Sequence, residues 1–386
     1  MLSFDFLQRS RFISGPGVID QLGALAKELS ATRVLIVSDP GVVAAGLYQK
    51  GLNSLEAAGL TCLGFHDLHE NPSTDDIDAG VKVAKDFRPD LLVGLGGGSS
   101  MDCAKGINFV YSCGGRMHDY WGKGKATSDM LPMIAVPTTA GTGSESQSYA
   151  LISDTQTHVK MACGDPRAAC RIALLDPELT VTQPTRVTAL TGIDAMTHAL
   201  ETFVTKDRNA ISIAYSRAAW QYLSHSFSKV LEDPYDLDAR SRMQIGACLA
   251  GMAIEASMLG AAHALANPLT AHFGMAHGQA VGVMMPAVLR ANGRETHIAE
   301  LYRMLLVDLG IHVSFDKAGD TLADWFVKHL QMAGLANRIS LLDHNGTSFE
   351  SIKSTLGKAA AAQWTASFNP IIYDATEMER LYESVS

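Results

Sequence analysis

The sequence predicts an α/β N-terminal domain with a parallel sheet, residues 1–180, followed by an all-α C-terminal domain, residues 181–386. Two observations support this fold class. Up to about residue 175, short apolar runs alternate with amphipathic stretches, which is the pattern of repeated strand–helix units and of a parallel sheet covered by helices. Beyond residue 180 the apolar residues recur at helical spacing. A chain of 386 residues is long enough for two domains that each bury a core.

Each strand expected in the N-terminal half is a short apolar run that ends at turn residues. The first, Val34–Val37, ends at Ser-Asp-Pro-Gly, and the leucine spacing after it predicts a helix over Val42–Ala58. Another helix is expected over Thr74–Phe87, and the segment Met1–Ser14 is expected to add an edge strand. We expect further strands at 61–65, 90–96, 133–136 and 171–175, and a hairpin that pairs 149–153 with 158–162.

The C-terminal half is rich in Ala, Leu and Met, and it almost lacks the β-branched alternation of strands. We interpret its apolar stripes as core packing between helices. The expected helices span residues 185–204, 210–231, 238–258 and 295–309.

Composition argues against several classes of protein. The net charge of -9 and the pI near 5.8 disfavour nucleic acid as a partner. No segment approaches the roughly 18 uncharged apolar residues that cross a membrane, and the first residues do not resemble a secretory leader. The six cysteines form no C-x-x-C pair, which favours reduced thiols. A cytoplasmic protein that binds neither membrane nor nucleic acid is expected.

Asp194 and His198 lie four residues apart in a predicted helix. At that spacing two side chains share one face, so a carboxylate oxygen and an imidazole nitrogen can converge on one point. The pair alone is weak evidence, because an Asp and a His at this spacing are more often a surface pair than metal ligands.

His263 and His277 strengthen the case for a metal site. Pro268 and Gly274 lie between them, and this favours a helix, a bend and a second helix that bring both rings to the same place. One carboxylate and three imidazoles suit Fe(II) or Zn(II), whereas oxygen ligands alone would suggest Mg²⁺ or Ca²⁺.

A glycine loop, Gly96–Asp102, follows a predicted strand and precedes an apolar-periodic run that begins near Asp102. Glycines that open a helix present free backbone N–H groups to a phosphate, although they can also simply make a tight turn. Asp39 ends an earlier strand, so both features are expected at one edge of the sheet and could hold the two ends of a dinucleotide. A carboxylate there would repel a 2′-phosphate and favour NAD(H), although Asp39 also suits a turn-stabilising role. The loop 137–145 could add hydroxyls and amides on the other side.

Four motifs together resemble those of the iron-containing (group III) alcohol dehydrogenases. They are Gly-Gly-Gly-Ser-x-x-Asp at 96–102, Pro-Thr-Thr-Ala-Gly-Thr-Gly-Ser-Glu at 137–145, Gly-Ile-Asp-Ala-Met-Thr-His-Ala at 192–199, and His263 through Gly278. The resemblance covers nearly the whole chain and keeps the order of the motifs. It implies a dinucleotide-binding N-terminal domain, a metal-binding helical domain, and a homodimer or higher homo-oligomer.

The resemblance also implies roles for individual residues. Carried over by position, the metal ligands are Asp194, His198, His263 and His277. The positions that match cofactor contacts are Asp39, Asn71, Gly97, Gly98, Ser99, Thr138, Thr139 and Lys160.

The expected reaction is metal-assisted hydride transfer between NAD(H) and a short-chain alcohol or diol, with its aldehyde or ketone as the other partner. A divalent ion, with Fe(II) favoured and Zn(II) or Mn(II) as alternatives, would polarise the substrate oxygen. One departure concerns the proton route, because Asn267 stands where the family commonly carries a histidine.

Other functions remain open on the sequence. The nearest are zinc enzymes on the same plan, resembling glycerol dehydrogenase or dehydroquinate synthase. A metal hydrolase is a more distant alternative, since the H-E-x-x-H pattern that supplies a water-activating glutamate is absent at His198. A non-catalytic nucleotide sensor is a further alternative.

Overall fold

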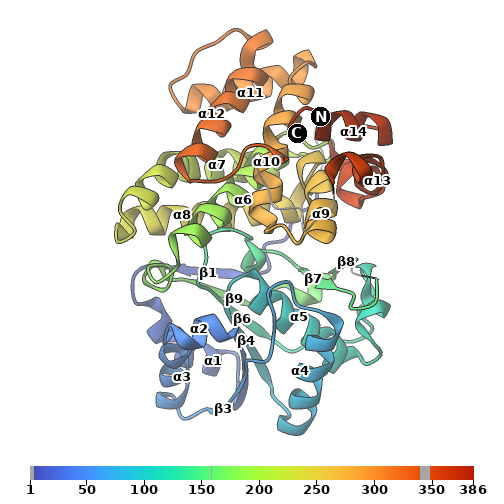
Figure 1. Cartoon of the computed structure of the whole chain (residues 1–386). Helices are drawn as coiled ribbons and strands as arrows, with labels where there is room; N and C mark the ends of the chain where they lie inside the picture. The colour runs from blue at the N-terminus through green and yellow to red at the C-terminus, as the bar shows by residue number, and fades with distance from the viewer. Residues whose placement is uncertain (1–3, 158, 340–347) are drawn as a thin grey trace. The chain divides into compact units, whose positions relative to one another are not determined.

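The computed structural model describes residues 4–157, 159–339 and 348–386 (Figure 1). By contacts the chain divides into two compact units, Leu7–Gln183 and Pro184–Ser386, and the second also takes in residues 4–6. The ring of Phe6 lies 6.0 Å from that of Tyr215, which belongs to the helical unit. The predicted domain boundary at residue 180 stays a prediction.

Among the described residues, six parallel strands form one sheet in the first unit, in the order β1-β9-β6-β4-β2-β3 (Figure 1). This confirms the predicted parallel sheet, with the N-terminal segment as an edge strand. The strands are β1 Arg11–Ser14, β2 Arg33–Val37, β3 Thr61–Phe65, β4 Leu91–Gly96, β6 Met133–Pro137 and β9 Ile172–Leu175.

The predicted hairpin forms part of a smaller sheet. Strand β7, Tyr149–Ser153, pairs antiparallel with β8, Lys160–Gly164, and β5, Gly122–Lys123, pairs parallel with β8. Residue 158, where the second strand was predicted to begin, lies outside the described residues.

The large sheet is buried on both faces because successive side chains of a strand point to opposite sides. In β2, Val34 and Ile36 pack with leucines of helices α1 and α3, whereas Leu35 and Val37 pack with apolar residues of α4 and α5. A continuous apolar run is the expected sequence of such a strand. The helices of this unit are α1 Leu22–Glu28, α2 Pro40–Ala44, α3 Leu47–Ala57, α4 Thr74–Phe87 and α5 Gly98–Cys113.

Two helices of the first unit differ from the prediction. The helix expected over Val42–Ala58 is broken into α2 and α3 at Gly46, whose φ of 75° is left-handed and ends a helix. Helix α5 begins at Gly98, inside the glycine loop, and not near Asp102. Helical periodicity did not show this start because the first turn carries glycines and serines in place of apolar residues.

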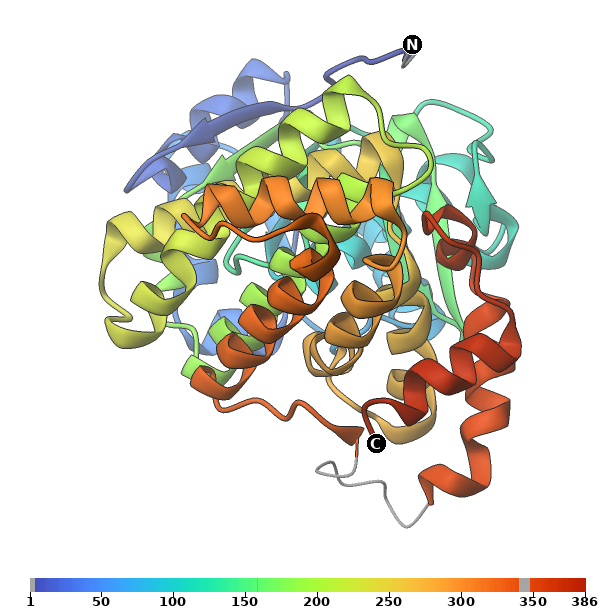
Figure 2. The ribbon, with the colours of Figure 1, turned by 90° about the horizontal axis from the view of Figure 1, so that it is seen from above.

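The second unit is helical, as predicted. Helix α6 has its predicted bounds, and α7, α8 and α11 lie within one residue of theirs at each end. In Figure 2 the C-terminal helices α13 and α14, coloured red, lie side by side. The helices are α6 Thr185–Val204, α7 Ala210–Glu232, α8 Leu237–Ser257, α9 Ala261–Phe273, α10 His277–Asn292, α11 Thr296–Asp308, α12 Ala318–Met332, α13 Phe349–Ala361 and α14 Ala375–Glu383.

The predicted helix, bend and helix around His263 and His277 is confirmed, and of the two residues named for the bend only Gly274 breaks the helix. Pro268 stays inside α9, which continues to Phe273. Gly274, with φ 61°, ends α9, and α10 begins at His277. The left-handed glycine therefore makes the turn, since proline alone does not end this buried helix.

Short 3-10 helices complete the described structure. They are η1 Val18–Gln21, η2 Met117–Tyr120, η3 Ser144–Ser146, η4 Pro166–Ala168, η5 Pro177–Thr180, η6 Phe315–Lys317 and η8 Trp364–Phe368. In the described part of the chain no single helix has the length and apolarity to cross a membrane. Helices α8 and α9 reach that threshold only together, by length and composition, and they meet at a bend of 104°.

Candidate functional site

Helix α6 presents three ionisable side chains on one buried face. Asp194, His198 and Glu201 stand at positions i, i+4 and i+7, which is two turns of the same face. All three are buried, with exposed fractions of 4%, 4% and 2%. A buried charged group needs a partner, so this face is not an ordinary packing surface.

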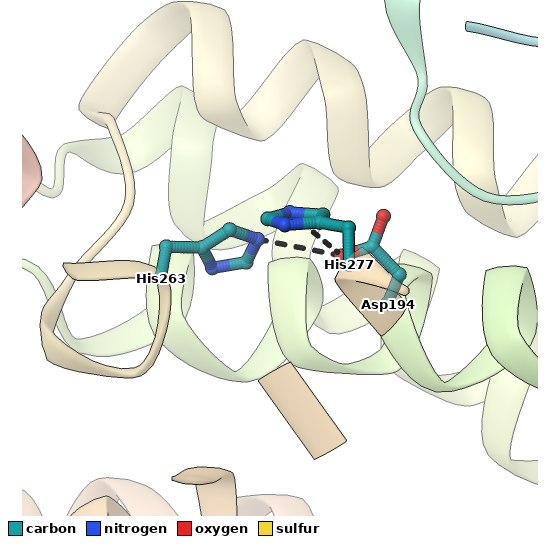
Figure 3. Close-up of side chains that lie close together, drawn as sticks. All are labelled: Asp194, His263 and His277. Atoms are coloured by element: carbon teal, nitrogen blue, oxygen red, sulfur yellow. Dashed lines mark ion pairs between the residues drawn. The ribbon is translucent and has the colours of Figure 1, made fainter. Parts of the chain in front are cut away.

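The imidazoles of three histidines converge on one oxygen of Asp194. The distance from Asp194 Oδ1 to Nε2 is 3.3 Å for His198, 3.4 Å for His263 and 3.8 Å for His277. Figure 3 shows the side chains of His263 and His277 directed at the Asp194 carboxylate. One ligand atom from each of Asp194, His263 and His277 lies within 4.8 Å of the other two, and His198 joins this group through Asp194.

Two buried atoms of this cluster indicate a cation site. Asp194 Oδ1 and His263 Nε2 are both buried, and neither has a hydrogen-bond partner in the described part of the chain. An acceptor and an imidazole nitrogen buried face to face would cost stability unless a proton or a cation lies between them. One carboxylate with three imidazoles is a donor set for a borderline divalent transition metal.

The electrostatics of the cluster agree with this donor set. Burial by itself would raise the pKa of Asp194, but the imidazoles of His198, His263 and His277 hold it well below its ordinary value. Burial disfavours protonation of His263, but the carboxylates of Glu201 and Asp194 outweigh burial and raise its pKa to about 9. The cluster therefore holds a positive charge beside Asp194, and a bound cation would take the place of the proton.

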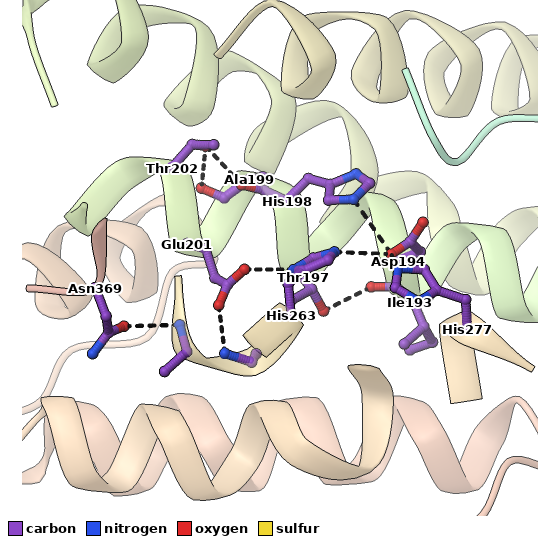
Figure 4. Close-up of polar contacts among 12 residues, drawn as sticks. Ile193, Asp194, Thr197, His198, Ala199, Glu201, Thr202, His263, His277 and Asn369 are labelled. Atoms are coloured by element: carbon purple, nitrogen blue, oxygen red, sulfur yellow. Dashed lines mark hydrogen bonds and ion pairs between the residues drawn. The ribbon is translucent and has the colours of Figure 1, made fainter. Parts of the chain in front are cut away.

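Glu201 also belongs to this cluster, through a contact with His263 that the sequence analysis did not identify. Its Oε2 lies 2.5 Å from His263 Nδ1, and its Oε1 accepts a hydrogen bond of 2.6 Å from the Ala262 amide (Figure 4). A signal was present in the sequence, because Glu201 lies on the face of Asp194 and His198. The contact with His263, 62 residues away, was not encoded in any local pattern.

In the first unit, Asp39 and the glycine loop lie at the carboxyl edge of two neighbouring strands. Asp39 follows β2 and the loop follows β4, and these strands pair directly. The chain leaves β2 towards β3 on one side, whereas it leaves β4 towards β6 on the other. Ligands of open α/β sheets bind at such a switch point, outside the carboxyl ends of the strands.

Close packing explains the glycines of the loop. A Cβ on Gly98 would lie 2.7 Å from the Thr142 side chain, and one on Gly97 would lie 3.3 Å from that of Thr139. The amide of Thr138 donates to the Gly96 carbonyl at 3.0 Å, so the loops after β4 and β6 run against each other. Gly97 is the N-cap of α5 and offers no side-chain oxygen, which leaves amides of the first turn available to an anion.

The structure also brings together Asn71, Ser99 and Lys160. The Asn71 amide donates to Ser99 Oγ at 3.2 Å, and Lys160 Nζ donates to Asn71 Oδ1 at 3.1 Å. Asn71 is left-handed, with φ 56°, a conformation that asparagine tolerates better than most residues. The predicted cofactor contacts therefore come from several loops but gather around the start of α5.

A buried lysine holds the loop after β6, and the sequence reasoning did not identify it. Lys105 is fully buried, and its Nζ donates to the carbonyls of Ser144, Gln147 and Tyr149 at 2.6, 2.9 and 3.0 Å. It also donates to Ser144 Oγ at 2.9 Å, and that hydroxyl donates to Asp102 Oδ1 at 2.6 Å. Lys105 thus fixes the segment that contacts the glycine loop.

Asn267, which departs from the expected histidine, makes a side-chain contact of its own. Its Nδ2 donates to Gln363 Oε1 at 3.1 Å. The amide lies one turn beyond His263 on the same face of α9, so it is near that imidazole but carries no titrating group.

Two family models match the chain. One, described as iron-containing alcohol dehydrogenase, matches residues 9–177. The other, described as Fe-containing alcohol dehydrogenase family, C-terminal, matches residues 188–386.

Curated relatives and solved structures agree with these models. The chain is 34% identical over 294 residues to the NAD-dependent methanol dehydrogenase of Bacillus methanolicus, which covers 75% of this chain and 77% of that one. It is 34% identical over 291 residues to the 1,3-propanediol dehydrogenase of Citrobacter freundii, covering 75% of each. The crystal structure of a 1,3-propanediol oxidoreductase superposes with a TM-score of 0.93 at 28% identity and covers 100% of both chains. The chain therefore belongs to the iron-containing alcohol dehydrogenase family, whose members are oxidoreductases that interconvert alcohols and aldehydes or ketones.

Proposed function

We propose that this chain interconverts short-chain alcohols or diols and their aldehydes or ketones with NAD(H) as cofactor. In this proposal Asp194, His198, His263 and His277 hold one divalent ion. The single observation that carries it is the convergence of three imidazole Nε2 atoms on Asp194 Oδ1, at 3.3 to 3.8 Å.

The ion, when bound, supplies a Lewis acid that polarises the oxygen of the alcohol or carbonyl substrate. The chain supplies the ligands, and it buries Asp194, His198 and His263 away from water. The description of the family favours Fe(II) here, and the imidazole and carboxylate donors also suit the alternatives, Zn(II) and Mn(II). His277 is the most exposed of the three histidines, with 24% of its side chain accessible, so the cluster is open on its side.

The proposed cofactor site uses Asp39, Asn71, Gly97, Gly98, Ser99, Thr138, Thr139 and Lys160. The cofactor supplies the hydride acceptor or donor. The start of α5 binds the phosphates through backbone amides, and Asp39 accepts hydrogen bonds from ribose hydroxyls and repels a 2′-phosphate. A relative at 34% identity is named an NAD-dependent enzyme, which supports NAD(H) over NADP(H).

Small uncharged substrates fit what is known of the chain. Relatives at 34% identity are named for methanol and 1,3-propanediol. The net charge of -9 gives no reason to expect an anionic substrate. A hydrolase is disfavoured because both carboxylate oxygens of Glu201 are engaged, one by His263 and one by the Ala262 amide, and so are not available to activate water.

We also propose that the protein acts in the cytoplasm and as a homodimer or higher homo-oligomer. The six cysteines are free thiols in the structure, which suits a reducing compartment. Light scattering of the purified protein at several concentrations would give the oligomeric state.

The decisive experiment measures metal and turnover together. The purified protein is stripped with a chelator, reloaded with Fe(II), Zn(II) or Mn(II), and assayed with short alcohols and aldehydes and with NAD(H). We expect about one ion per chain, turnover that depends on it, and loss of both in His277→Ala. His272→Ala is the matched control, because His272 is an exposed histidine of α9 outside the cluster. Full turnover by metal-free protein would refute the proposal.

A further inference from the structure

We propose that Glu201 is a positioning residue of the metal site, because its carboxylate fixes both the imidazole of His263 and the backbone that carries it. The inference rests on the proposed function, since it presupposes that the histidine cluster binds a divalent ion. Glu201 lies outside the proposed ligand set, and its role is to prepare one ligand for the ion.

The first step of the argument is the contact with the ring. Glu201 Oε2 lies 2.5 Å from His263 Nδ1, and both side chains are almost completely buried, with 2% and 4% of their surface accessible. An ionised carboxylate only accepts hydrogen bonds, so Nδ1 must carry a proton. The opposite nitrogen, Nε2, is then the one that offers a lone pair to a metal.

The geometry of the ring agrees with that assignment. His263 Nε2 points towards Asp194 Oδ1 at 3.4 Å, on the side of the ring away from Glu201. Figure 4 shows Glu201, His263 and Asp194 in sequence, with the ring between the two carboxylates. One carboxylate therefore holds the proton-bearing side of His263 while the other lies at the ligand side.

The second step concerns the backbone. Glu201 Oε1 accepts from the Ala262 amide at 2.6 Å, and Asn369 Oδ1 accepts from the Ala261 amide at 3.2 Å. These are first-turn amides of α9, which have no acceptor within the helix. A carboxylate at a helix N-terminus is also favoured by the helix dipole.

Space at this helix end is limited, which restricts how the backbone can move. A Cβ on Gly260 would lie 2.9 Å from Asn369 Oδ1 and 3.1 Å from Glu201 Oε1. Asn369 is itself held by Asn292, the last residue of α10, through hydrogen bonds of 2.9 and 3.2 Å. The start of α9 is thus held by Glu201 from α6 and by an amide that is tied to the far end of α10.

A carboxylate suits this position better than an amide of the same shape. Both groups that face Glu201, the Nδ1–H of His263 and the Ala262 N–H, are donors, and a carboxylate has an acceptor oxygen for each. Glutamine has one oxygen and one NH₂ group, so one of the two contacts would become donor against donor. If the NH₂ faces the ring, the proton moves to Nε2 and blocks the ligand lone pair. If it faces the backbone, the first turn of α9 loses its cap.

The test uses Co(II), whose visible absorption reports its coordination. Metal-free wild type, Glu201→Gln and Glu300→Gln are titrated with Co(II) against a competing chelator. Glu300 is an exposed glutamate of α11 and is the matched control. We expect Glu201→Gln to bind Co(II) about 10- to 100-fold more weakly than wild type, with a changed visible spectrum. Glu300→Gln should match wild type in both.

The outcomes separate this inference from the proposed function. If the wild type binds no Co(II), the proposed metal site fails. If the wild type binds it, and a folded Glu201→Gln binds with the same affinity and spectrum, the role of Glu201 is wrong. Circular dichroism of the metal-free proteins establishes folding. If Glu201→Gln does not fold, Glu201→Asp replaces it in the test, since Asp keeps both acceptor oxygens on a shorter side chain. We expect Glu201→Asp to bind Co(II) more weakly than wild type. Wild-type binding by Glu201→Asp, or failure of both variants to fold, would overturn the inference in favour of a purely structural role.

Discussion

Asp39 and Ser100 exchange two hydrogen bonds across the ends of neighbouring strands. The Ser100 hydroxyl donates to Asp39 Oδ2 at 2.9 Å, and the Asp39 amide donates to Ser100 Oγ at 3.1 Å. The other carboxylate oxygen, Oδ1, caps α2 by accepting from the Val42 amide at 3.0 Å. Asp39 is therefore both a helix cap and a fixed negative charge beside the glycine loop.

Because Asp39 has both roles, a test of cofactor preference must remove the charge and keep the helix cap. Asn caps helices about as well as Asp, so Asp39→Asn keeps the cap and removes the charge. Without repulsion of a 2′-phosphate, we expect the ratio of kcat/KM for NADPH to that for NADH to rise about tenfold, or about 1.4 kcal/mol. Steady-state kinetics with both cofactors measure the ratio. Asp78→Asn, at an exposed position of α4, is the control. An unchanged ratio in Asp39→Asn would remove Asp39 from cofactor selection.

Gly278 allows α10 to approach α6 closely, because glycine has no Cβ. A Cβ there would lie 2.2 Å from the Leu190 carbonyl oxygen, so Gly278→Ala must push the first turn of α10, which carries His277, away from α6, which carries Asp194. We expect a loss of about 1 to 3 kcal/mol of stability and at least about tenfold weaker metal binding. Thermal unfolding and metal titration measure the two effects.

Gly310→Ala is the control for Gly278→Ala. Gly310 follows α11 with φ 75°, and a Cβ there meets nothing within 4 Å. We expect it to lose stability through backbone strain without a change in metal affinity. Equal metal affinity in Gly278→Ala and wild type would show that His277 tolerates this displacement.

Asn267 carries no proton that titrates near neutral pH. A histidine at this position has an ordinary pKa near 6.5, and Asn267→His would place it one turn from His263. We expect the pH profile of kcat/KM to gain a step between about pH 5.5 and 7.5, with an unchanged metal content. Assays across that range, with metal analysis at each pH, measure both. If the two profiles superpose, position 267 lies off the proton route in this chain.

We expect Glu145 to make the stability of the first unit depend on pH. Burial raises the pKa of Glu145 to about 7, and Lys105 only partly opposes this. Since this pKa exceeds that of the unfolded chain, the contribution of Glu145 to stability is complete below about pH 4.5 and is lost as the pH rises through about 7.

Replacing Glu145 tests that sign. We expect Glu145→Gln to be more stable than wild type at pH 8, by up to about 3 kcal/mol, and the advantage to disappear near pH 4.5. Urea unfolding at both pH values gives the comparison. Glu178→Gln, which alters an exposed side chain, should show no such difference. A pH-independent effect of Glu145→Gln would mean that Glu145 keeps an ordinary pKa.

Much of the fold could be predicted because local sequence patterns encode it. The run Val34–Val37 is apolar on both faces, as a strand covered on both sides must be. Helix α6 was predicted with its observed bounds, because its apolar period persists over 20 residues. The predicted helix boundaries were wrong where backbone conformation, and not the spacing of apolar residues, sets the boundary. This is so at Gly46, between α2 and α3, and at the start of α5.

The sequence by itself determined which residues share a face. The spacing of Asp194 and His198 places a carboxylate and an imidazole one turn apart in any helix, and the alternation of apolar runs with amphipathic stretches requires a covered parallel sheet. Both features depend only on residues that are close in the sequence, because the periods of helices and strands fix which neighbouring side chains point the same way.

Only the tertiary structure decided which groups meet across elements. The pairing of Glu201 with His263 depends on where Gly260 and Gly274 start and end α9, and the burial of Lys105 under the loop after β6 depends on how α5 packs on the sheet. Such contacts join residues tens of positions apart. Their distances follow from the packing of whole helices, which no short window of sequence contains.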